Sequence, residues 1–483
     1  MSTIAASRIP EPNAFRTVAE PFLQAAGLPF AKVLSAEQIE EAFAARDALF
    51  GQEPDEVFST PLVLWAFLAQ TLRDGKGAAC ASAVSDIATY RQQTGGRMPC
   101  GDTGDYCRAR AKLDLLALRS LVRRSGRELE RLAKEQWLWH GRHAKLVDGF
   151  TFTMPDTPDN QEAFPQPDTQ APGVGFPIAR ACAVLSLATG AVQDLAIGPY
   201  QGKETGETAL LRTILDCVQA GDIVVFDRCY CSYTMIAMLQ ARGADVCVRL
   251  HQTRPVEFGC GTSLGESDCL VTWQRPRRED WQTPEEHQKT SPTLTLRMLE
   301  YSVPTACRAE SITLVTTLID PQSYPKQDVA DLFGDRWFVE LDIRDIKQTL
   351  GLDHARCKTP EMVRRELWVK LLAYNLIRKV IATAAAVHHR QPRQIGFTLA
   401  CQTILSSWML LATGACPDTG ALWRSALARI AANKVGNRPG RVEPRVQKRR
   451  RHHYPLMTRS RQELKEELRR AQRAGRETRC ARQ

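Results

Sequence analysis

Residues 144–152 read AKLVDGFTF, an apolar run with an aspartate, Asp148, in its middle. A second run of this kind, GDIVVFDR at residues 221–228, contains Asp227 just before its end. Short apolar runs rich in Val, Ile and Phe, bounded by Gly or charge, are typical of buried core strands. A buried carboxylate costs free energy unless it is paired or bound to a metal ion. Both aspartates therefore need partners, although a strand-end aspartate such as Asp227 can also cap the following turn.

The segments around these two runs favour an α/β fold. We expect strands and helices to alternate in the order strand 144–153, strand 179–187, strand 191–197, helix 206–219, the Asp227 strand, helix 232–242 and strand 244–250. Three strands followed by alternating helices and strands indicate a mixed sheet. Residues 251–325 are expected to form a β-rich insertion, with strands at 268–274, 293–303 and 311–319.

A third carboxylate lies in the stretch FGDRWFVELDIRDIK at residues 333–347. On a helix, offsets of four and seven residues return to nearly the same face, so Arg336, Glu340 and Lys347 are expected to share one face. Phe333 stands just before that face. A glutamate offers a divalent metal a hard oxygen, and flanking cations suit phosphate oxygens. Taken alone, the stretch is better explained as a solvated helix face with an Arg–Glu pair, and the two upstream aspartates change that interpretation.

Three acidic residues from two strands and one later helix can converge on one or two divalent ions. Such ions activate a water or a 3′-hydroxyl and neutralise the charge that builds on a phosphate during in-line displacement. Clustered carboxylates also repel one another, so the metal is needed to hold them together. The sequence therefore predicts a Mg²⁺ site formed by Asp148, Asp227 and Glu340, with Mn²⁺ as the alternative ion.

Together these motifs resemble the DDE transposases of bacterial insertion sequences, specifically the insertion-sequence-four type. That family carries a Y-R-E-K pattern with gaps of two, three and six residues, and this chain matches every gap with Phe333, Arg336, Glu340 and Lys347. Phe stands here in place of Tyr. The sequence around both aspartates also resembles that of the family, as do the segments TGDYCRARAKL (103–113), KTPEMVRRELW (358–368) and AYNLIR (373–378). The resemblance covers roughly residues 60 to 400.

The resemblance implies a ribonuclease-H-like core in which the Asp148 strand lies beside the Asp227 strand. It also implies that Asp148, Asp227 and Glu340 are the catalytic triad. Arg336 and Lys347 would contact DNA phosphates near the cleaved end, and Arg228 and Phe333 belong with this predicted DNA-binding set.

Trp337 follows the motif arginine, at a position where an aromatic residue of relatives holds a DNA end with a flipped terminal base. Extracting a base costs a few kcal/mol, which stacking on an aromatic ring partly offsets. The alternative for Trp337 is core packing of an amphipathic helix. The partners implied by the resemblance are terminal inverted repeats and target DNA. Because an element has two ends, a homodimer is expected in the DNA complex.

The domain organisation follows from these assignments. We expect a helical N-terminal DNA-binding region at 1–140, a ribonuclease-H-like core at 144–250 and 326–400, the β-rich insertion at 251–325, C-terminal helices at 401–440 and a basic tail at 441–483. Arginines 108, 110 and 119 of the first region suit either phosphate contacts or surface salt bridges. Trp273 with arginines 275, 277 and 278 suits either a nucleic-acid contact or an exposed β-turn.

The net charge of +10 belongs to the tail, since residues 441–483 hold fifteen Lys and Arg against five Glu. Its densest part, RVQKRRRHH at 445–453, suits sequence-independent phosphate binding, although a solvated tail without a specific role explains it nearly as well. The chain has no apolar run of membrane-spanning length, and its first residues lack a signal-peptide core. A cytoplasmic bacterial protein, associated with the nucleoid when bound to DNA, is expected.

These observations predict a DNA transposase that excises and integrates an insertion sequence. It would use metal-dependent phosphodiester hydrolysis and strand transfer, through a hairpin end as the family implies. One alternative is a non-transposing, metal-dependent nuclease of the same fold. Another is a catalytically inactive DNA-binding derivative.

Overall fold

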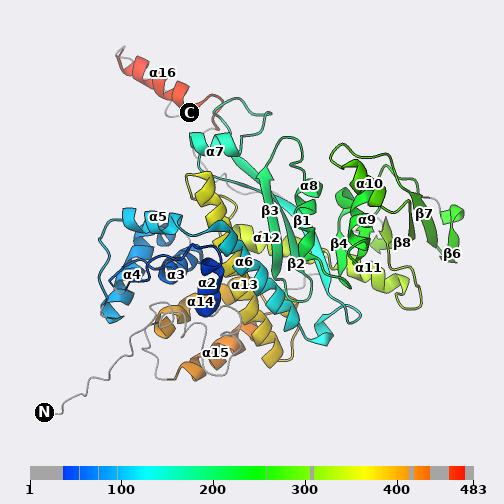
Figure 1. Cartoon of the computed structure of the whole chain (residues 1–483), viewed down its shortest axis with the longest axis horizontal. Helices are drawn as coiled ribbons and strands as arrows, with labels where there is room; N and C mark the ends of the chain where they lie inside the picture. Colours follow the sequence, from blue (N-terminus) through cyan, green and yellow to red (C-terminus); the bar gives the residue numbers. More distant parts are fainter. Residues whose placement is uncertain are drawn as a thin grey trace.

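The protein is a mixed α/β structure built around one nine-stranded sheet (Figure 1). The computed structural model describes residues 36–53, 55–73, 75–94, 96–256, 258–304, 309–412, 418–435 and 456–473. The strand order is β3-β2-β1-β4-β5-β9-β8-β7-β6. The strands are β1 (Ala144–Thr153), β2 (Ile178–Ser186), β3 (Val192–Pro199), β4 (Ile223–Phe226), β5 (Asp245–Arg249), β6 (Thr262–Gly265), β7 (Asp268–Gln274), β8 (Thr293–Pro304) and β9 (Ala309–Thr316).

The pairing of these strands confirms the predicted mixed sheet. β1 pairs antiparallel with β2 and parallel with β4, so the two aspartate strands are neighbours as expected. β4 pairs parallel with β5, and β5 pairs antiparallel with β9. The predicted strands of the insertion all form, and they continue the core sheet through β9.

Helices cover both faces of the sheet. They are α2 (Ala36–Ala44), α3 (Thr60–Thr71), α4 (Cys80–Thr94), α5 (Gly104–Ala111), α6 (Leu115–Arg131), α7 (Pro158–Ala163), α8 (Glu207–Arg212), α9 (Tyr233–Gln240), α10 (Pro284–Lys289), α11 (Lys326–Gly334), α12 (Trp337–Arg344), α13 (Pro360–Val387), α14 (Phe397–Ala412), α15 (Thr419–Ala432) and α16 (Arg461–Arg473). None of these described helices has both the length and the apolar character needed to cross a membrane.

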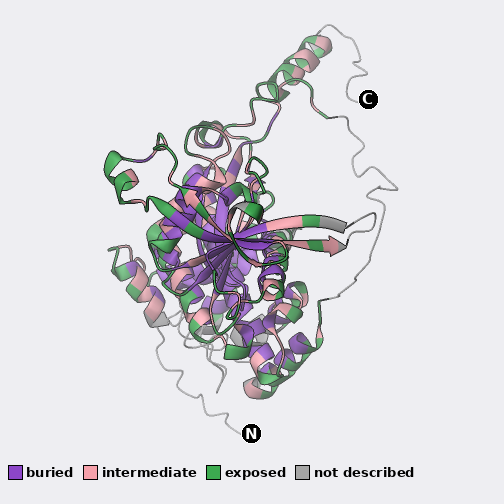
Figure 2. Ribbon diagram, turned by 90° about the vertical axis from the view of Figure 1, so that its right-hand side faces the viewer, coloured by how far each residue is buried: buried purple, intermediate pink, exposed green. Residues whose placement is uncertain are grey.

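Successive strand residues point to opposite faces, which divides the core into two layers. Leu146 and Val225 pack into a large cluster with α3 to α6 and α11 to α15. Their neighbours Val147 and Val224 face the other way, into a smaller cluster with α8 and α9. The buried residues gather along the middle of the sheet and on the helices against it (Figure 2).

Within the N-terminal helical region, α5 and α6 are separate helices, because the Asp114 carboxylate accepts a hydrogen bond of 2.8 Å from the Ala117 amide and begins α6. The expected helix 206–219 is wrong in length, since α8 ends at Arg212 and a 3-10 turn follows at Leu215–Cys217. The basic run 445–453 lies outside the described residues.

The sequence predicts a glutamate helix from Asp335 to about Leu350 that stops at Gly351, and the structure forms a continuous helical segment from Trp337 to Thr349. Phe333 belongs to the preceding helix α11, and α12 begins at Trp337. After Arg344 the chain forms a π-helical turn, Asp345–Thr349, in which the Leu350 amide donates to the Asp345 carbonyl at 3.1 Å. The end of the segment is as predicted, with Gly351 in the left-handed region at φ +65°.

The long helix α13 contacts α12 through the hydrogen bond from Arg378 to Asp342. Pro360 lies in its first turn, where proline is tolerated, and most of its 28 residues are buried. Near its middle, the side chain of the fully buried Asn375 accepts from the Val192 amide at 2.8 Å and donates to the Val192 carbonyl at 2.9 Å. It also donates to the Val122 carbonyl and the Ser125 hydroxyl of α6. One amide group therefore joins α13, α6 and β3.

Helix α6 lies very close to β3 at Gly126. A Cβ atom there would be 2.3 Å from the Val192 carbonyl oxygen, which belongs to strand backbone and cannot simply rotate away. Gly→Ala inside a helix normally stabilises a protein by about 1 kcal/mol. At this position we expect Gly126→Ala to lower the free energy of unfolding by about 1–3 kcal/mol, because the added atom overpacks the contact.

Denaturant unfolding of Gly126→Ala beside Gly334→Ala tests this expectation. A Cβ on the helical Gly334 would meet no atom within 4 Å, so that control should be neutral or stabilised. Equal stability changes in the two variants would contradict the close packing of α6 on β3.

Candidate active site

Asp148 and Asp227 lie near each other at the carboxyl end of the parallel strand pair, close enough for the Asp227 charge to raise the pKa of Asp148. In the β1–β4 register Ala144 faces Ile223 and Leu146 faces Val225; Asp148 follows two residues later in β1, and Asp227 directly follows β4. Neighbouring strands are about 4.8 Å apart. Asp148 has the parity of Leu146, so it points to the face that α12 covers. Asp227 also caps the next turn, since its carboxylate accepts from the Cys229 amide at 2.9 Å.

Arg336 connects the third carboxylate to the first. Its guanidinium donates to Glu340 Oε1 at 3.0 Å and lies 3.7 Å from Asp148 Oδ2. Arg336 and Glu340 are therefore on one face of the helix segment, as predicted. The Glu340 side chain is 36% exposed and the Asp148 side chain 21%, so the acids line an accessible edge rather than a closed core.

Electrostatics at this edge favour a cation. Burial raises the pKa of Asp148 to about 6, and the nearby carboxylates of Asp227 and Glu207 add to the increase. The hydrogen bond from the Gly149 amide and the charge of Arg336 act in the opposite direction. Two or more carboxylates close together hold a proton or a cation more strongly than one carboxylate in water.

Glu207 is a fourth carboxylate at this edge, which the sequence reasoning missed. Its side chain lies against the backbone of Gly149, where a Cβ atom would be 2.1 Å from the Glu207 Cδ atom. Glu207 Oε2 accepts from the Tyr230 hydroxyl at 3.2 Å and lies 3.9 Å from the Cys229 thiol, which in turn lies 2.8 Å from Asp227 Oδ1. The available signal was Gly149 itself, because an isolated glycine within a strand often marks a close approach of another group.

The remaining predicted DNA-binding residues lie in different surroundings. Trp337 is 58% exposed on α12, which excludes core packing as its main role. Arg228 is exposed beside Asp227. Phe333 is buried, with the Arg336 guanidinium 5.9 Å from its ring centre. Lys347 lies in the π-helical turn and pairs with Asp353 at 3.0 Å.

Several other basic residues serve the structure. Arg119 forms a two-bond pair with the buried Asp194, at 3.0 and 2.6 Å. Arg275 donates to three backbone carbonyls, and Arg278 donates to the Gln282 carbonyl. For Arg119, Arg275 and Arg278, these contacts favour a structural role over a contact with nucleic acid.

The donor chemistry of the edge fits Mg²⁺ or Mn²⁺, which prefer carboxylate oxygens. Within the part of the chain that the structure describes, no three Asp, Glu, His or Cys side chains are yet close enough to surround an ion. The Arg336 guanidinium lies between Asp148 and Glu340 instead.

Comparison with known proteins found similar sequences and one similar solved structure. The family model described as the transposase DDE domain matches residues 139–376, a range that contains all four acids and the Arg336–Lys347 segment. Transposase InsG for insertion sequence element IS4 of Escherichia coli (strain K12) is 26% identical over 321 residues, covering 66% of this chain and 70% of that protein. The transposase for insertion sequence element IS421 of Escherichia coli is 35% identical over 68 residues, 14% of this chain and 18% of that protein. A piggyBac transposase in a synaptic complex with hairpin DNA aligns over 88% of each chain, with 10% identity and a TM-score of 0.42.

Proposed function

The chain belongs to the DDE transposases, and on that premise we propose that it excises and integrates an insertion sequence of the insertion-sequence-four type. One observation carries this proposal. Asp148 and Asp227 belong to neighbouring parallel strands, and Arg336 pairs with Glu340 while it lies 3.7 Å from Asp148. The order of strands and helices around them supports a ribonuclease-H-like core.

Asp148, Asp227 and Glu340 would hold Mg²⁺, with Mn²⁺ as a substitute. Bound there, the ions would lower the pKa of an attacking water or 3′-hydroxyl and neutralise charge on the phosphodiester. Arg336 would turn from the carboxylates to a DNA phosphate, and Arg228 and Lys347 would add further phosphate contacts. Phe333 would act through Arg336, whose guanidinium lies over its ring.

The DNA partners would be the terminal inverted repeats of the element and the target duplex. Residues 1–140 would bind the repeats, and the basic tail would add salt-dependent, sequence-independent affinity. Because two ends must be joined, we propose a two-fold homodimer in the DNA complex.

A strand-transfer assay tests the proposed function. Purified protein would be incubated with Mg²⁺, a labelled duplex carrying the inverted repeat that flanks the gene, and a target plasmid. We expect cleaved ends and joined products. Cleavage without joining would point to a nuclease, and binding without cleavage would point to an inactive derivative.

Metal binding should depend on the protonation of Asp148. Because burial raises its pKa to about 6, this carboxyl keeps its proton at acidic pH, and the proton must leave before the group binds a metal. We expect the apparent affinity for Mn²⁺ to rise with pH through about 6 and then to level off. Mn²⁺ titrations from about pH 5 to about pH 8 measure it. Asp148→Asn should lose this pH step, and a step that persists in the variant would assign it to another group.

We also propose a hairpin step in which Trp337 stacks on a flipped base. Stacking of a base on an aromatic ring is worth about 1–3 kcal/mol, so Trp337→Ala should slow hairpin formation by about tenfold or more. The exposed position of Trp337 means that truncation leaves no cavity, so stability and first-strand nicking should stay near the native values. Denaturing gels separate nicked from hairpin products. An equal loss of both products would contradict a role specific to the hairpin step.

A further inference from the structure

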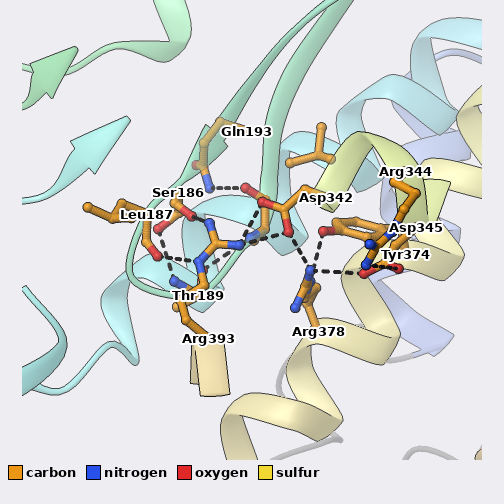
Figure 3. A network of polar contacts seen from close by, with 12 residues as sticks. Ser186, Leu187, Thr189, Gln193, Asp342, Arg344, Asp345, Tyr374, Arg378 and Arg393 are labelled. Atoms are coloured by element: carbon orange, nitrogen blue, oxygen red, sulfur yellow. Dashed lines mark hydrogen bonds and ion pairs between the residues drawn. The ribbon is translucent and has the colours of Figure 1, made fainter. Parts of the chain in front are cut away.

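A buried network of charges lies where α12, α13 and the end of β2 meet (Figure 3). Its centre is Asp342, two residues after Glu340, with a side chain that is 1% exposed. Arg378 of α13 and Arg393 both bind this carboxylate. We call Asp342, Arg378 and Arg393 the Asp342 clamp.

Each arginine of the clamp is held by a second element. Arg393 donates from Nη1 to both oxygens of Asp342, at 2.7 and 2.6 Å. The same guanidinium donates to the Leu187 carbonyl at 2.6 Å and to the Ser186 carbonyl at 2.7 Å, at the end of β2. Asp342 is therefore tied directly to the backbone of the sheet.

Arg378 connects the same carboxylate to the long helix behind it. It donates to Asp342 and, at 2.8 Å, to the Tyr374 hydroxyl one turn earlier in α13. Asp345 of the π-helical turn lies 3.8 Å from Arg378 and adds a second negative charge. The two arginines and two aspartates balance each other in charge, which burial in a low dielectric requires.

The turn between β2 and β3 makes room for these groups. Gly190 has φ +76°, and a Cβ atom there would lie 2.8 Å from Arg378 Nε and 2.9 Å from Arg393 Nη1. Two like-charged guanidinium groups therefore pass directly over a glycine, with Asp342 holding them together. The turn, α12, α13 and the Arg393 segment meet at this point.

Helix α12 needs such an anchor because it is short. It spans eight residues, is separated from α11 by Asp335 and Arg336, and passes directly into a π-helical turn of five residues. Residues two apart on a helix differ by about 200°, which places Asp342 and Glu340 on nearly opposite faces. A rotation of α12 about its axis would move Glu340 away from Asp148, while the directional bonds of the clamp resist that rotation.

We propose that the Asp342 clamp is a positioning device that sets where the Glu340 carboxylate lies relative to Asp148 and Asp227. This inference rests on the proposed metal-binding role of Glu340. Apolar packing would fill the same space, but it would leave α12 free to turn by small angles. Misplacement of a catalytic group by about 1 Å can cost about a hundredfold in rate.

Binding of Mn²⁺ to the full chain is the decisive measurement, with affinity for an end-bearing duplex and the cleavage rate measured alongside it. The variants are Asp342→Asn and Arg393→Lys, which keeps the charge but loses the planar fork. The matched control is Asp268→Asn, which breaks a pair of similar burial with Arg297 in the insertion. All three variants perturb a buried ion pair, so a general loss of stability should affect them alike.

We expect both clamp variants to weaken Mn²⁺ binding by about tenfold and to slow cleavage by at least that factor. Duplex affinity should stay within about twofold, and Asp268→Asn should bind Mn²⁺ as the native protein does. In a Glu340→Gln background, Asp342→Asn should lower Mn²⁺ affinity no further, because the group that it positions is already lost.

Clamp variants that bind Mn²⁺ as tightly as the control would overturn the proposal and leave the clamp a stability element. An additional loss in the Glu340→Gln background would overturn it too. If Asp342→Asn does not fold, Arg393→Lys decides the question. If Glu340→Gln itself binds Mn²⁺ and cleaves normally, the proposed function fails instead, so the two failures are distinguishable.

Discussion

Glu340→Gln is expected to abolish cleavage of the element's ends while the protein still binds the same DNA. Glutamine keeps the shape of the side chain and its hydrogen bond with Arg336, but it removes the charge that a divalent ion needs. Since catalytic groups act as a unit, the loss should be on the order of a thousandfold or more. Cleavage of a labelled end duplex in Mg²⁺, with a gel-shift on the same duplex in Ca²⁺, measures both properties.

The matched control is Glu204→Gln, the same chemical change at an exposed glutamate that pairs with Arg212. Surface pairs of this kind contribute little, so the control should cleave normally. Cleavage by Glu340→Gln at the control's rate would remove Glu340 from the catalytic set.

Asn375→Leu is expected to cause the largest loss of stability. Leucine has a similar shape but leaves the Val192 amide and carbonyl without the partner that Asn375 provides inside the core. Buried groups left unsatisfied cost about 1–3 kcal/mol each, so the free energy of unfolding should fall by about 2–4 kcal/mol. Chemical denaturation followed by tryptophan fluorescence measures the change.

Asn160→Leu is the matched control, because Asn160 is equally buried but makes fewer bonds. Its amide nitrogen donates to the Pro155 and Cys357 carbonyls at 3.0 and 3.4 Å, and its Oδ1 atom has no hydrogen-bond partner among the described residues. The control should lose clearly less stability than Asn375→Leu. Similar losses would show that burial, rather than the four hydrogen bonds of Asn375, determines the cost.

The sheet could be predicted from the sequence because its strands are short apolar runs with clear boundaries. β1 was expected at 144–153 and β7 at 268–274, which are their observed bounds. Buried strands with little polar interruption leave few alternatives. The pairing of β1 with β4 was expected from the family resemblance and from the order of the elements, and the parallel register carries both strands toward the same edge, where Asp148 and Asp227 lie.

The surroundings of the acids could not be predicted in the same way. The π-helical turn after Arg344 has no residue pattern of its own, so an α-helix was expected through Lys347. Asp342 and Arg393 are 51 residues apart in the chain, and periodicity carries no information on such a pair. Glu207 reaches the edge from α8, and only Gly149 hinted that a group lies there. Local patterns predict elements, whereas these features depend on how distant elements meet.

The continuity of the sheet across the insertion has a mechanical consequence. β9 is hydrogen-bonded to β5 and β5 to β4, and Asp227 follows the last residue of β4. Backbone hydrogen bonds therefore connect the outer strands continuously with the candidate active site. A hinge motion between the outer strands and the candidate active site would have to break these backbone hydrogen bonds. Any ligand that the outer strands bind would therefore be held at a fixed orientation relative to the candidate active site.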